Sequence, residues 1–228
     1  MWWRMLSVDL SRKPITVCAR GSLLSRAQVE EVYREMTQFH PSLQFDAIWV
    51  ETTGDRDLNI SLRTLDKTDF FTKEIDALQL SGICRISIHS AKDLAMPLPQ
   101  GLSLIALTRG QDSSDVLVLR DRETLSDLMT GAAIGVSSMR REQAIHELRS
   151  DLKCVDIRGS IDRRLAILDS CAVDGVVVAE AALIRLQLTH RNRLLLPGSS
   201  TALQGRLAIL AREDDEEMKQ LFSCIDAR

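Results

Sequence analysis

Short apolar runs alternate along the chain with longer segments in which apolar residues recur at helical spacing. The short runs predict strands at 15–19, 45–50, 85–88, 102–107, 115–119, 132–136, 154–157, 175–178 and 207–210. Helices are predicted at 22–38, 70–80 and 138–149, around Ile161, Leu165 and Leu168, through Arg185, and at 213–225. Strands that alternate with helices in this way are typical of an α/β fold with mostly parallel sheets.

Some segments add detail to this pattern. The first helix carries an apolar stripe that we assign to the core, made of Val29, Val32, Tyr33, Met36 and Phe39. The run 175–178 is wholly apolar, as expected for a strand that is covered on both faces. The segment 52–69 is polar and rich in turn residues, and it predicts a long, mobile loop. The segment 109–114, R-G-Q-D-S-S, is a candidate crossing between two lobes.

The composition is that of an ordinary globular protein. Of the 228 residues, 45% are apolar and 27% are charged, and the formal net charge is −3. No bulk basic field therefore argues for nucleic acid as a partner. No apolar run approaches the roughly 20 residues that span a bilayer, and residues 1–10 lack the pattern of a signal peptide. We therefore expect a cytoplasmic protein that does not bind membranes.

Five cysteines are scattered singly along the chain, at positions 18, 84, 154, 171 and 224. No cysteine pair, and no cysteine–histidine pair, has the spacing of zinc ligands. The odd number also gives no sign of a disulfide framework. We therefore expect reduced thiols and no metal site.

The stretch 87–99, S-I-H-S-A-K-D-L-A-M-P-L-P, places polar chemistry at the end of a predicted strand. In open α/β sheets, ligands bind beyond the carboxyl ends of the strands. Lys92 offers a cation for anion binding, and Asp93 beside it offers a carboxylate for proton or cation chemistry. The alternative is a solvated turn with a surface ion pair. His89 has no evident serine or aspartate partner, so we expect it to be a hydrogen-bonded structural residue.

Arginine is unusually frequent, with 23 arginines against 6 lysines, and it recurs where predicted strands end and helices begin. Three junctions share this pattern: A-R-G-S at 19–22, V-S-S-M-R-R at 136–141 and I-R-G-S at 157–160. A helix N-terminus already carries partial positive charge, so arginine there is unfavourable unless an anion lies between. With Lys92 at a fourth strand end, the junctions predict a cleft for an anion with several carboxylate or phosphate groups.

Two alternatives stay open for these arginines, because genomic base composition can enrich arginine and helix-start arginines can simply be solvated. If the cleft exists, Asp93 is the one acid among its cations and is a candidate for catalysis rather than binding. The chain has no G-x-G-x-x-G after the first strand, no P-loop and no G-x-S-x-G motif. Nucleotide binding and a serine nucleophile elbow are therefore not supported.

Taken together, the motifs resemble the porphobilinogen deaminase (hydroxymethylbilane synthase) family over about residues 14–213. The matching segments are A-R-G-S at 19–22, T-G-D-R-D at 53–57, F-x-K-E-I-D at 71–76, I-H-S-A-K-D-L-x-x-P-L-P-x-G-L at 88–102, G-V-S-S-M-R-R at 135–141, R-S-D-L at 149–152, I-R-G-S-x-x-R-R-L at 157–165 and A-A-L-x-R-L at 181–186. The resemblance implies an α/β fold of two periplasmic-binding-protein-like lobes with a cleft between them. By position, one lobe comprises 14–108 plus 198–213, the other comprises 109–197, and 214–228 forms a C-terminal helix.

The resemblance also implies an activity, the head-to-tail condensation of four porphobilinogen units to hydroxymethylbilane with loss of ammonia. Porphobilinogen carries an acetate and a propionate arm, so the growing product is a polycarboxylate. By position, Asp93 would be the catalytic carboxylate. Substrate carboxylates would be held by Arg20, Arg158, Arg164 and Arg185. The dipyrromethane cofactor, which serves as primer, would be held by Ser22, Ser90, Lys92, Ser138, Arg140 and Arg141.

The chain departs from the family pattern in several places. It resembles a shortened member, because Arg228 stands about where a third domain with the primer-bearing cysteine would begin. None of the five cysteines has the matching context, and Cys18 and Cys224 are the substitutes to consider. The mobile-loop lysine of the family is replaced in the segment 68–71. Arg85 stands where an acid is usual, and the family turn G-Q-G-A reads L-Q-G-R at 203–206.

Three hypotheses follow from these departures. The first is an active, shortened deaminase whose primer is bound without a covalent bond or through another cysteine. The second is a non-catalytic two-lobed binder of pyrrole polycarboxylates or another small polyanion, and the third is an inactive remnant kept for a partner. Retention of Asp93 favours the first, because a pure anion binder gains nothing from a carboxylate that faces anions. We further expect a homodimer through the face that the third domain would cover, or else lowered stability.

Overall fold

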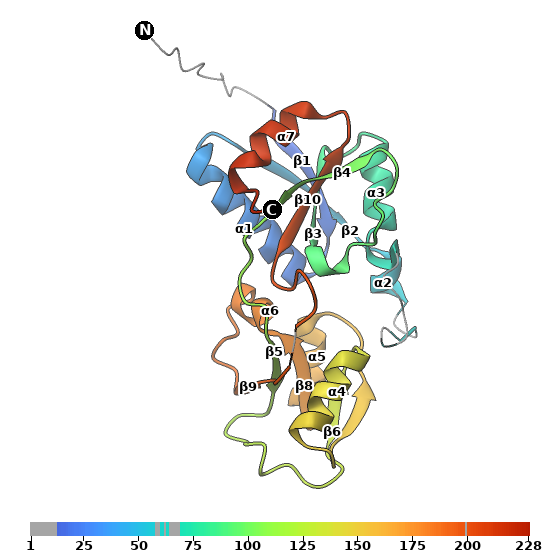
Figure 1. Ribbon diagram of the computed structural model, residues 1–228, viewed down its shortest axis with the longest axis vertical. Helices are drawn as coiled ribbons and strands as arrows, with labels where there is room; N and C mark the ends of the chain where they lie inside the picture. Colours follow the sequence, from blue (N-terminus) through green and yellow to red (C-terminus); the bar gives the residue numbers. More distant parts are fainter. Residues whose placement is uncertain (1–12, 58–59, 62, 64–68, 199) are drawn as a thin grey trace.

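Two β-sheets, each with five strands, organise the protein into two lobes that lie one above the other in Figure 1. The computed structural model describes residues 13–57, 60, 61, 63, 69–198 and 200–228. The sheet of the first lobe has the order β2 (Phe45–Val50), β1 (Ile15–Arg20), β3 (Ile86–Ser90), β10 (Leu207–Arg212), β4 (Leu102–Leu107). The sheet of the second lobe has the order β7 (Lys153–Asp156), β6 (Ala133–Val136), β8 (Gly175–Ala179), β5 (Asp115–Val118), β9 (Arg193–Leu195).

The helices follow the strands in the predicted order. They are α1 (Leu23–Phe39), α2 (Thr53–Arg56), α3 (Lys73–Leu80), α4 (Met139–Leu148), α5 (Ile161–Asp169), α6 (Glu180–Arg185) and α7 (Glu216–Phe222), with 3₁₀ turns η1 (Asp69–Phe71), η2 (Ala91–Asp93) and η3 (Ser223–Ile225). The α/β fold with two lobes is therefore confirmed. The expectation of mostly parallel sheets is also confirmed, because four strands of each sheet run in the same direction and β10 and β5 alone run antiparallel to both of their neighbours. Both sheets are thus mixed.

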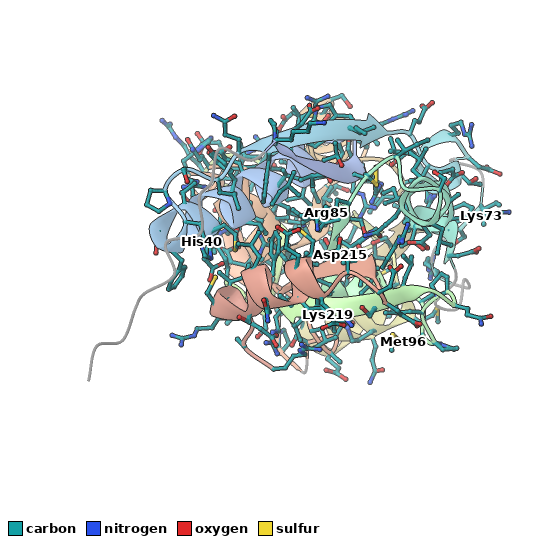
Figure 2. The ribbon with its side chains drawn as sticks, turned by 90° about the horizontal axis from the view of Figure 1, so that it is seen from above. His40, Lys73, Arg85, Met96, Asp215 and Lys219 are labelled. Carbon is teal, nitrogen blue, oxygen red and sulfur yellow. A yellow bond between two sulfur atoms is a disulfide. The ribbon has the colours of Figure 1, made fainter. Side chains whose placement is uncertain are left out.

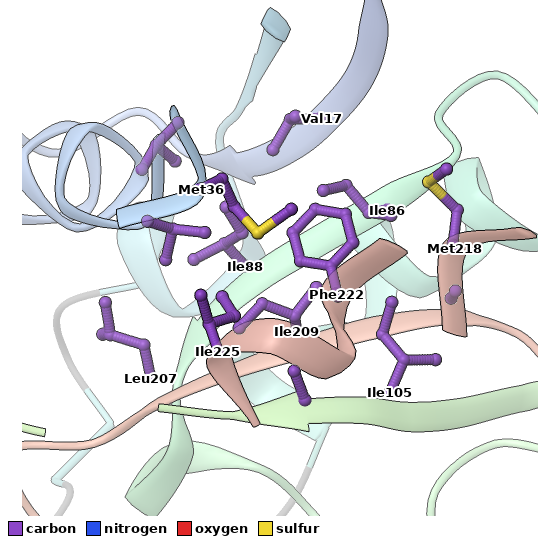
Figure 3. Packing of buried hydrophobic residues seen from close by; sticks show 14 of the residues in the cluster. Val17, Met36, Ile86, Ile88, Ile105, Leu207, Ile209, Met218, Phe222 and Ile225 are labelled. Atoms are coloured by element: carbon purple, nitrogen blue, oxygen red, sulfur yellow. The ribbon is translucent and has the colours of Figure 1, made fainter. Parts of the chain in front are cut away.

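Helices α1 and α7 cover one face of the first sheet. Met36 of α1 and Phe222 of α7 lie together over the buried strand residues Ile86 and Ile209 (Figure 3). Val32 of α1 belongs to the same cluster. In the predicted apolar stripe of α1, Val29, Val32 and Met36 are buried and Tyr33 is partly buried, whereas 54% of Phe39 is exposed. Phe39 is the last residue of α1, one turn beyond the buried Met36.

In the second lobe, α4 packs against one face of the sheet, and α5 and α6 pack against the other. Strand β8 is buried at every position, as its wholly apolar sequence predicts. Ile145 of α4 and Leu168 of α5 lie fully buried on these opposite faces. Because both faces are covered, only the strand ends and the helix starts remain available for polar chemistry.

Two crossing segments join the lobes, one from β4 to β5 and one from β9 to β10 (Figure 1). They meet where the Cβ of a residue other than glycine at position 205 would lie 2.4 Å from the backbone oxygen of Asp112. Gly205 also has a φ of +82°, a conformation that glycine adopts at little cost. The predicted crossing 109–114 is one of these two segments.

Further contacts tie the first lobe to its C-terminal segment. Arg85 donates to Asp215 at 2.8 and 2.9 Å and also contacts Glu217, and Figure 2 shows Arg85 beside Asp215 at the start of α7. Arg85, which departs from the family pattern, therefore anchors the last helix. No helix among the described residues is long and apolar enough to cross a membrane.

Two sequence expectations need correction. Cys18 and Cys84 form a disulfide with a Cα–Cα distance of 5.8 Å, although the cysteine pattern indicated only reduced thiols. Their spacing of 66 residues carries no motif, and it is the pairing of β1 with β3 that brings them together. The predicted loop 52–69 begins instead with the short helix α2, and its last residue starts η1. Positions 58, 59, 62 and 64–68 lie outside the described residues.

Candidate functional site

A cavity of about 800 Å³ lies between the lobes, where strand ends of both sheets face each other. All the site residues that the sequence analysis proposed line this cavity: Arg20, Ser22, Ser90, Lys92, Asp93, Ser138, Arg140, Arg141, Arg158, Arg164 and Arg185. Eight arginines and one lysine line it, against three carboxylates, Glu51, Asp55 and Asp93. The cavity is therefore strongly cationic although the whole chain has a net charge of −3.

The junction of β1 and α1 forms part of the first-lobe wall. Ser22 is the N-cap of α1, and its hydroxyl accepts a hydrogen bond of 3.2 Å from the backbone N–H of Ser25. Arg20 forms an ion pair with Asp55 and lies 4.4 Å from the centre of the Phe71 ring. Burial raises the pKa of Asp55, but its hydrogen bonds from Arg20 and Thr52 outweigh burial and leave that pKa below its ordinary value.

Just after the end of β3, the carboxylate of Asp93 accepts no hydrogen bond from the described residues. The turn η2 carries Asp93 into the cavity wall, and the side chain of Ser90 just before it accepts 2.7 Å from the amide of Gln28. Among the described residues, none donates a hydrogen bond to the Asp93 carboxylate. In contrast, Asp55 and Asp115 in the same region are both paired with arginines. Asp93 and the exposed Glu51 are therefore the acids of the cavity whose oxygens are available to a bound molecule.

Lys92 lies beside Asp93 and donates a 3.0 Å hydrogen bond to the side-chain oxygen of Gln204. Burial lowers the pKa of Lys92 to about 8, with a further contribution from the positive charge of Arg141. Gln204 is buried, and its amide donates to the backbone oxygens of Ser113 and Ser114 on the other crossing segment. Lys92 is thus held at the hinge between the two lobes.

His89 has the structural role that the sequence predicted. Its Nε2 lies 3.0 Å from the Ser87 hydroxyl, which itself donates 2.8 Å to the Gln79 side chain. Because that hydroxyl proton is already used, His89 Nε2 carries the hydrogen and donates. Burial, with the charge of Arg20, lowers the pKa of His89 to about 4. The imidazole is therefore neutral near pH 7 and is not positioned as a base.

The second-lobe wall is built on a buried aspartate. Asp115 begins β5 and forms ion pairs with Arg140 and with Arg141, whose Nη2 lies 2.7 Å from it. Burial raises the pKa of Asp115, but the two guanidinium groups outweigh it and bring that pKa below its ordinary value. Ser138 caps α4 and accepts from the backbone N–H of Arg141 at 3.3 Å. This aspartate orients both arginines toward the cavity.

Arg158 is the group with unmet hydrogen-bonding capacity. Its Nη2 donates to the backbone oxygens of Gly54 and Asp57 of the first lobe, at 3.3 and 3.1 Å. Its Nε and Nη1 are buried and have no hydrogen-bond partner among the described residues. Burial lowers the pKa of Arg158. A buried guanidinium with open donors is costly by itself, so this arrangement suits an anion that enters the cavity.

Arg164 and Arg185 differ in whether their guanidinium groups are already paired with a carboxylate. Arg164 donates to the Ser137 hydroxyl at 3.1 Å and has no carboxylate partner among the described residues. Burial and the nearby charge of Arg141 lower the pKa of Arg164 to about 10. Arg185, by contrast, forms two hydrogen bonds with Glu31 of α1, at 2.8 and 3.0 Å. Its guanidinium is therefore used to join the lobes, which the sequence did not predict.

The sequence analysis missed the acids that position these cations. Asp55 lies in the segment T-G-D-R-D, which the resemblance had marked without a role, so a signal was present. Asp115 and Glu31 lie in an apolar strand and an amphipathic helix, and nothing in those patterns sets them apart. Phe70 and Phe71, which contact Arg158 and Arg20, lie in a segment that was predicted only as helix.

Comparisons with known proteins identify the family of the chain that forms this cationic cavity. Residues 15–220 match the family model described as "Porphobilinogen deaminase, dipyromethane cofactor binding domain". The chain belongs to the porphobilinogen deaminase family. It is 38% identical over 214 residues to a probable porphobilinogen deaminase of Chlamydia pneumoniae, covering 94% of this chain and 91% of that protein. It is 38% identical over 213 residues to the porphobilinogen deaminase of Geobacillus kaustophilus, covering 92% and 69%.

Solved structures with the same fold include binding proteins. The methionine-binding protein MetQ matches with a TM-score of 0.59 at 12% identity, covering 92% of this chain and 89% of the other. A periplasmic substrate-binding protein of an ABC transporter from Coxiella burnetii matches with a TM-score of 0.57 at 17% identity, covering 92% and 91%. At these identities the likeness shows the fold alone, which is the two-lobed architecture of periplasmic binding proteins.

The donor set of the cavity fits a dipyrromethane, which as a product of two porphobilinogen units bears several carboxylates. The open donors of Arg158 and the carboxylate-free Arg164 can receive carboxylates, while the uncommitted Asp93 can accept hydrogen bonds from pyrrole N–H groups. No cysteine lines the cavity. Cys18 is bound to Cys84 in the core, and Cys224 lies on η3 beside His40. The structure thus offers cationic contacts for the cofactor and no adjacent thiol.

Proposed function

We propose that this chain is a hydroxymethylbilane synthase of tetrapyrrole biosynthesis, which condenses four porphobilinogen units and releases ammonia. Family membership supports the reaction class, that of a transferase. The observation that carries the proposal is a cavity with two buried nitrogens of Arg158 and a carboxylate of Asp93 that have no hydrogen-bond partner within the described part of the chain. An anion receptor explains the arginines, and only a reaction that develops positive charge on the bound molecule explains the acid.

Binding of the substrate would rely on the cations that retain open donors. Arg158 and Arg164 would each take a carboxylate of porphobilinogen through charge-assisted hydrogen bonds. Arg20 would contribute from the opposite wall, where its guanidinium rests on Phe71 and Asp55 fixes its orientation. Arg185 would reach a carboxylate only by giving up Glu31, so we assign it a smaller part in binding.

Asp93 would act on the reacting ring. In each cycle the C–N bond of the substrate's aminomethyl group breaks and ammonia leaves, and the resulting positive charge spreads onto the pyrrole nitrogen. A carboxylate at that N–H would stabilise the cation electrostatically. A new C–C bond then forms to the free α-position of the growing chain, and the proton on that carbon is lost. Asp93 would stabilise charge in both stages.

The remaining residues would position the dipyrromethane cofactor. Its contacts would come from Ser22, Ser90, Lys92, Ser138, Arg140 and Arg141. When bound, the cofactor supplies the free pyrrole position at which chain growth begins. Arg140 and Arg141 are already oriented by Asp115, so they would present preset donors and lose little freedom on binding.

The test is turnover by the purified full chain, followed as porphobilinogen loss and as appearance of hydroxymethylbilane. Asp93→Asn keeps the size of the side chain and removes its charge, and we expect a loss of kcat of at least 100-fold. Asp121→Asn is the control, because Asp121 is exposed and lies outside the cavity. If the two variants turn over equally, Asp93 is not the catalytic carboxylate. Binding of porphobilinogen without any turnover would favour the non-catalytic polyanion binder.

Intact mass, measured under native and denaturing conditions, tests how the cofactor is held. We expect an added dipyrromethane mass in the native spectrum that is lost on denaturation, because the cavity offers cations and no thiol. An adduct that survives denaturation would instead indicate a covalent bond, and peptide mapping would locate it among the free cysteines Cys154, Cys171 and Cys224. The absence of any adduct after incubation with porphobilinogen would contradict cofactor binding.

A further inference from the structure

A second group of reactive side chains lies in the second lobe, outside the cavity. Glu142 and His146 are four residues apart on α4, so they project from the same face of the helix, and Cys154 lies on the edge strand β7. The donor atoms of these three side chains all lie within 4.8 Å of one another. Glu142 Oε1 is 4.0 Å from His146 Nε2. None of the three lines the cationic cavity.

The three donors are a carboxylate oxygen, an imidazole nitrogen and a thiol sulfur. This combination suits zinc, which takes all three ligand types, and it does not suit magnesium or calcium, which prefer oxygen. Zinc–ligand bonds of about 2.0–2.3 Å at tetrahedral angles place neighbouring donors about 3.3–3.8 Å apart. The observed separations, none of them above 4.8 Å, therefore exceed those of a formed site by about 1.5 Å at most. A rotation of the His146 side chain could close this gap, because that side chain is 44% exposed and has room to move.

We propose that Glu142, His146 and Cys154 form a zinc-binding site. Three protein ligands leave a fourth position open to water or to another donor. The proposal is independent of the proposed function, because it uses none of the cavity residues. The spacing E-x₃-H-x₇-C is no zinc motif, and the three residues come together only in the folded lobe, where β7 pairs with β6 and α4 packs on the same sheet.

Arg63 makes the site part of the contact between the lobes. It belongs to the first-lobe segment between α2 and η1, and its guanidinium forms an ion pair with Glu142 Oε2. A zinc ion would use the other oxygen, Oε1, or would take Glu142 away from Arg63 altogether. In either case the guanidinium and the ion carry like charge and compete for one carboxylate. Zinc binding should therefore weaken this contact between the lobes.

The experiment is metal titration of the full chain with its free thiols reduced by a non-chelating reductant. Co²⁺ reports the ligands directly, because thiolate coordination produces a charge-transfer absorption band, and Zn²⁺ is then titrated against the cobalt complex. We expect one equivalent to bind with the thiolate band. Cys154→Ser and His146→Ala should each weaken binding at least tenfold. Cys171→Ser is the matched control, since Cys171 is also a free cysteine of the second lobe and is exposed.

His146→Ala guards against a folding artefact, because this side chain is half-exposed whereas Cys154 packs partly against the core. Arg63→Ala should tighten zinc binding severalfold by removing the competing cation. The proposal is overturned if no metal binds at one equivalent, if the cobalt band is absent, or if Cys171→Ser abolishes the band while Cys154→Ser keeps it. Weaker binding by Arg63→Ala would contradict the competition between Arg63 and the ion.

Discussion

Glu31 of α1 and Arg185 of α6 form a bidentate ion pair, at 2.8 and 3.0 Å, that joins the two lobes. Only 4% of the Arg185 side chain and 18% of the Glu31 side chain are exposed. Arg185 also donates 2.7 Å to the backbone oxygen of Gly205 at the hinge. One guanidinium therefore links an element of each lobe to the segment that crosses between them.

We expect Glu31→Gln to lower the free energy of unfolding by about 2 kcal/mol, because it leaves a buried guanidinium without its counter-charge. Glu30→Gln is the control, because Glu30 is exposed and forms a surface ion pair with Arg34 of the same helix, at 3.7 Å. Such surface pairs contribute about 0.5 kcal/mol or less. Urea unfolding of both variants measures the difference. Equal losses would show that the Glu31–Arg185 pair does not stabilise the arrangement of the lobes.

Arg158→Gln should separate binding from stability. The change removes two buried nitrogens for which the described residues offer no partner, so we expect the free energy of unfolding to be unchanged or slightly increased. The KM for porphobilinogen should rise at least tenfold, because those nitrogens are the open donors of the cavity. Arg140→Gln should raise KM less, since Arg140 is already paired with Asp115.

Steady-state kinetics and urea unfolding of the same preparations provide the measurement. Arg34→Gln, at an exposed position of α1, controls for loss of one positive charge. A variant Arg158→Gln that loses stability while KM stays constant would show that this arginine serves only to join its lobe to Gly54 and Asp57.

Gly205→Ala should lower the free energy of unfolding by more than the strain of a positive φ accounts for. Gly205 and Gly131 have similar φ values, +82° and +79°, so alanine is strained at both, at a cost of about 1–2 kcal/mol. A Cβ at position 205 would in addition lie 2.4 Å from the backbone oxygen of Asp112, whereas a Cβ at position 131 would meet no atom within 4 Å. We therefore expect a loss about 1–2 kcal/mol larger for Gly205→Ala than for Gly131→Ala. Thermal or urea unfolding of the pair decides this, and equal losses would mean that the crossing segments can move apart.

The fold could be predicted from local patterns, because each element carries its own signal. The apolar run of β8 and the stripe of α1 both indicate structure within a few residues of sequence. The strand-end arginines could be predicted to share a cleft for the same reason, since the carboxyl ends of neighbouring strands lie at one edge of a sheet. Local patterns also predicted that His89 is structural.

The features that the sequence did not predict depend on contacts between distant segments. The antiparallel pairing of β10 and β5 follows from chain crossings between the lobes, and strand sequences do not specify direction. The Cys18–Cys84 disulfide and the Glu31–Arg185 pair join residues 66 and 154 positions apart. Their residue types are unremarkable in isolation, so only the tertiary structure distinguishes a paired arginine such as Arg185 from an open one such as Arg158.

The buried imidazole of His89 should make stability depend on pH. Its pKa in the folded protein is about 4, below the ordinary value of 6.5, because burial and the charge of Arg20 disfavour the protonated ring. As pH falls below 6.5, the unfolded chain therefore takes up a proton that the folded chain does not. Stability falls between pH 6.5 and 4, and the contribution of this group changes no further below pH 4.

Between pH 7 and pH 5, this one group should lower the free energy of unfolding by about 2 kcal/mol. His89→Gln isolates the effect, because the amide can still donate to the Ser87 hydroxyl and cannot titrate. We expect urea unfolding to give the wild type a steeper pH dependence than the variant by that amount, while carboxylates titrate alike in both. Parallel pH profiles would show that His89 is protonated in the folded state at pH 5, and the hydrogen bond to Ser87 could not then fix it as the neutral ring.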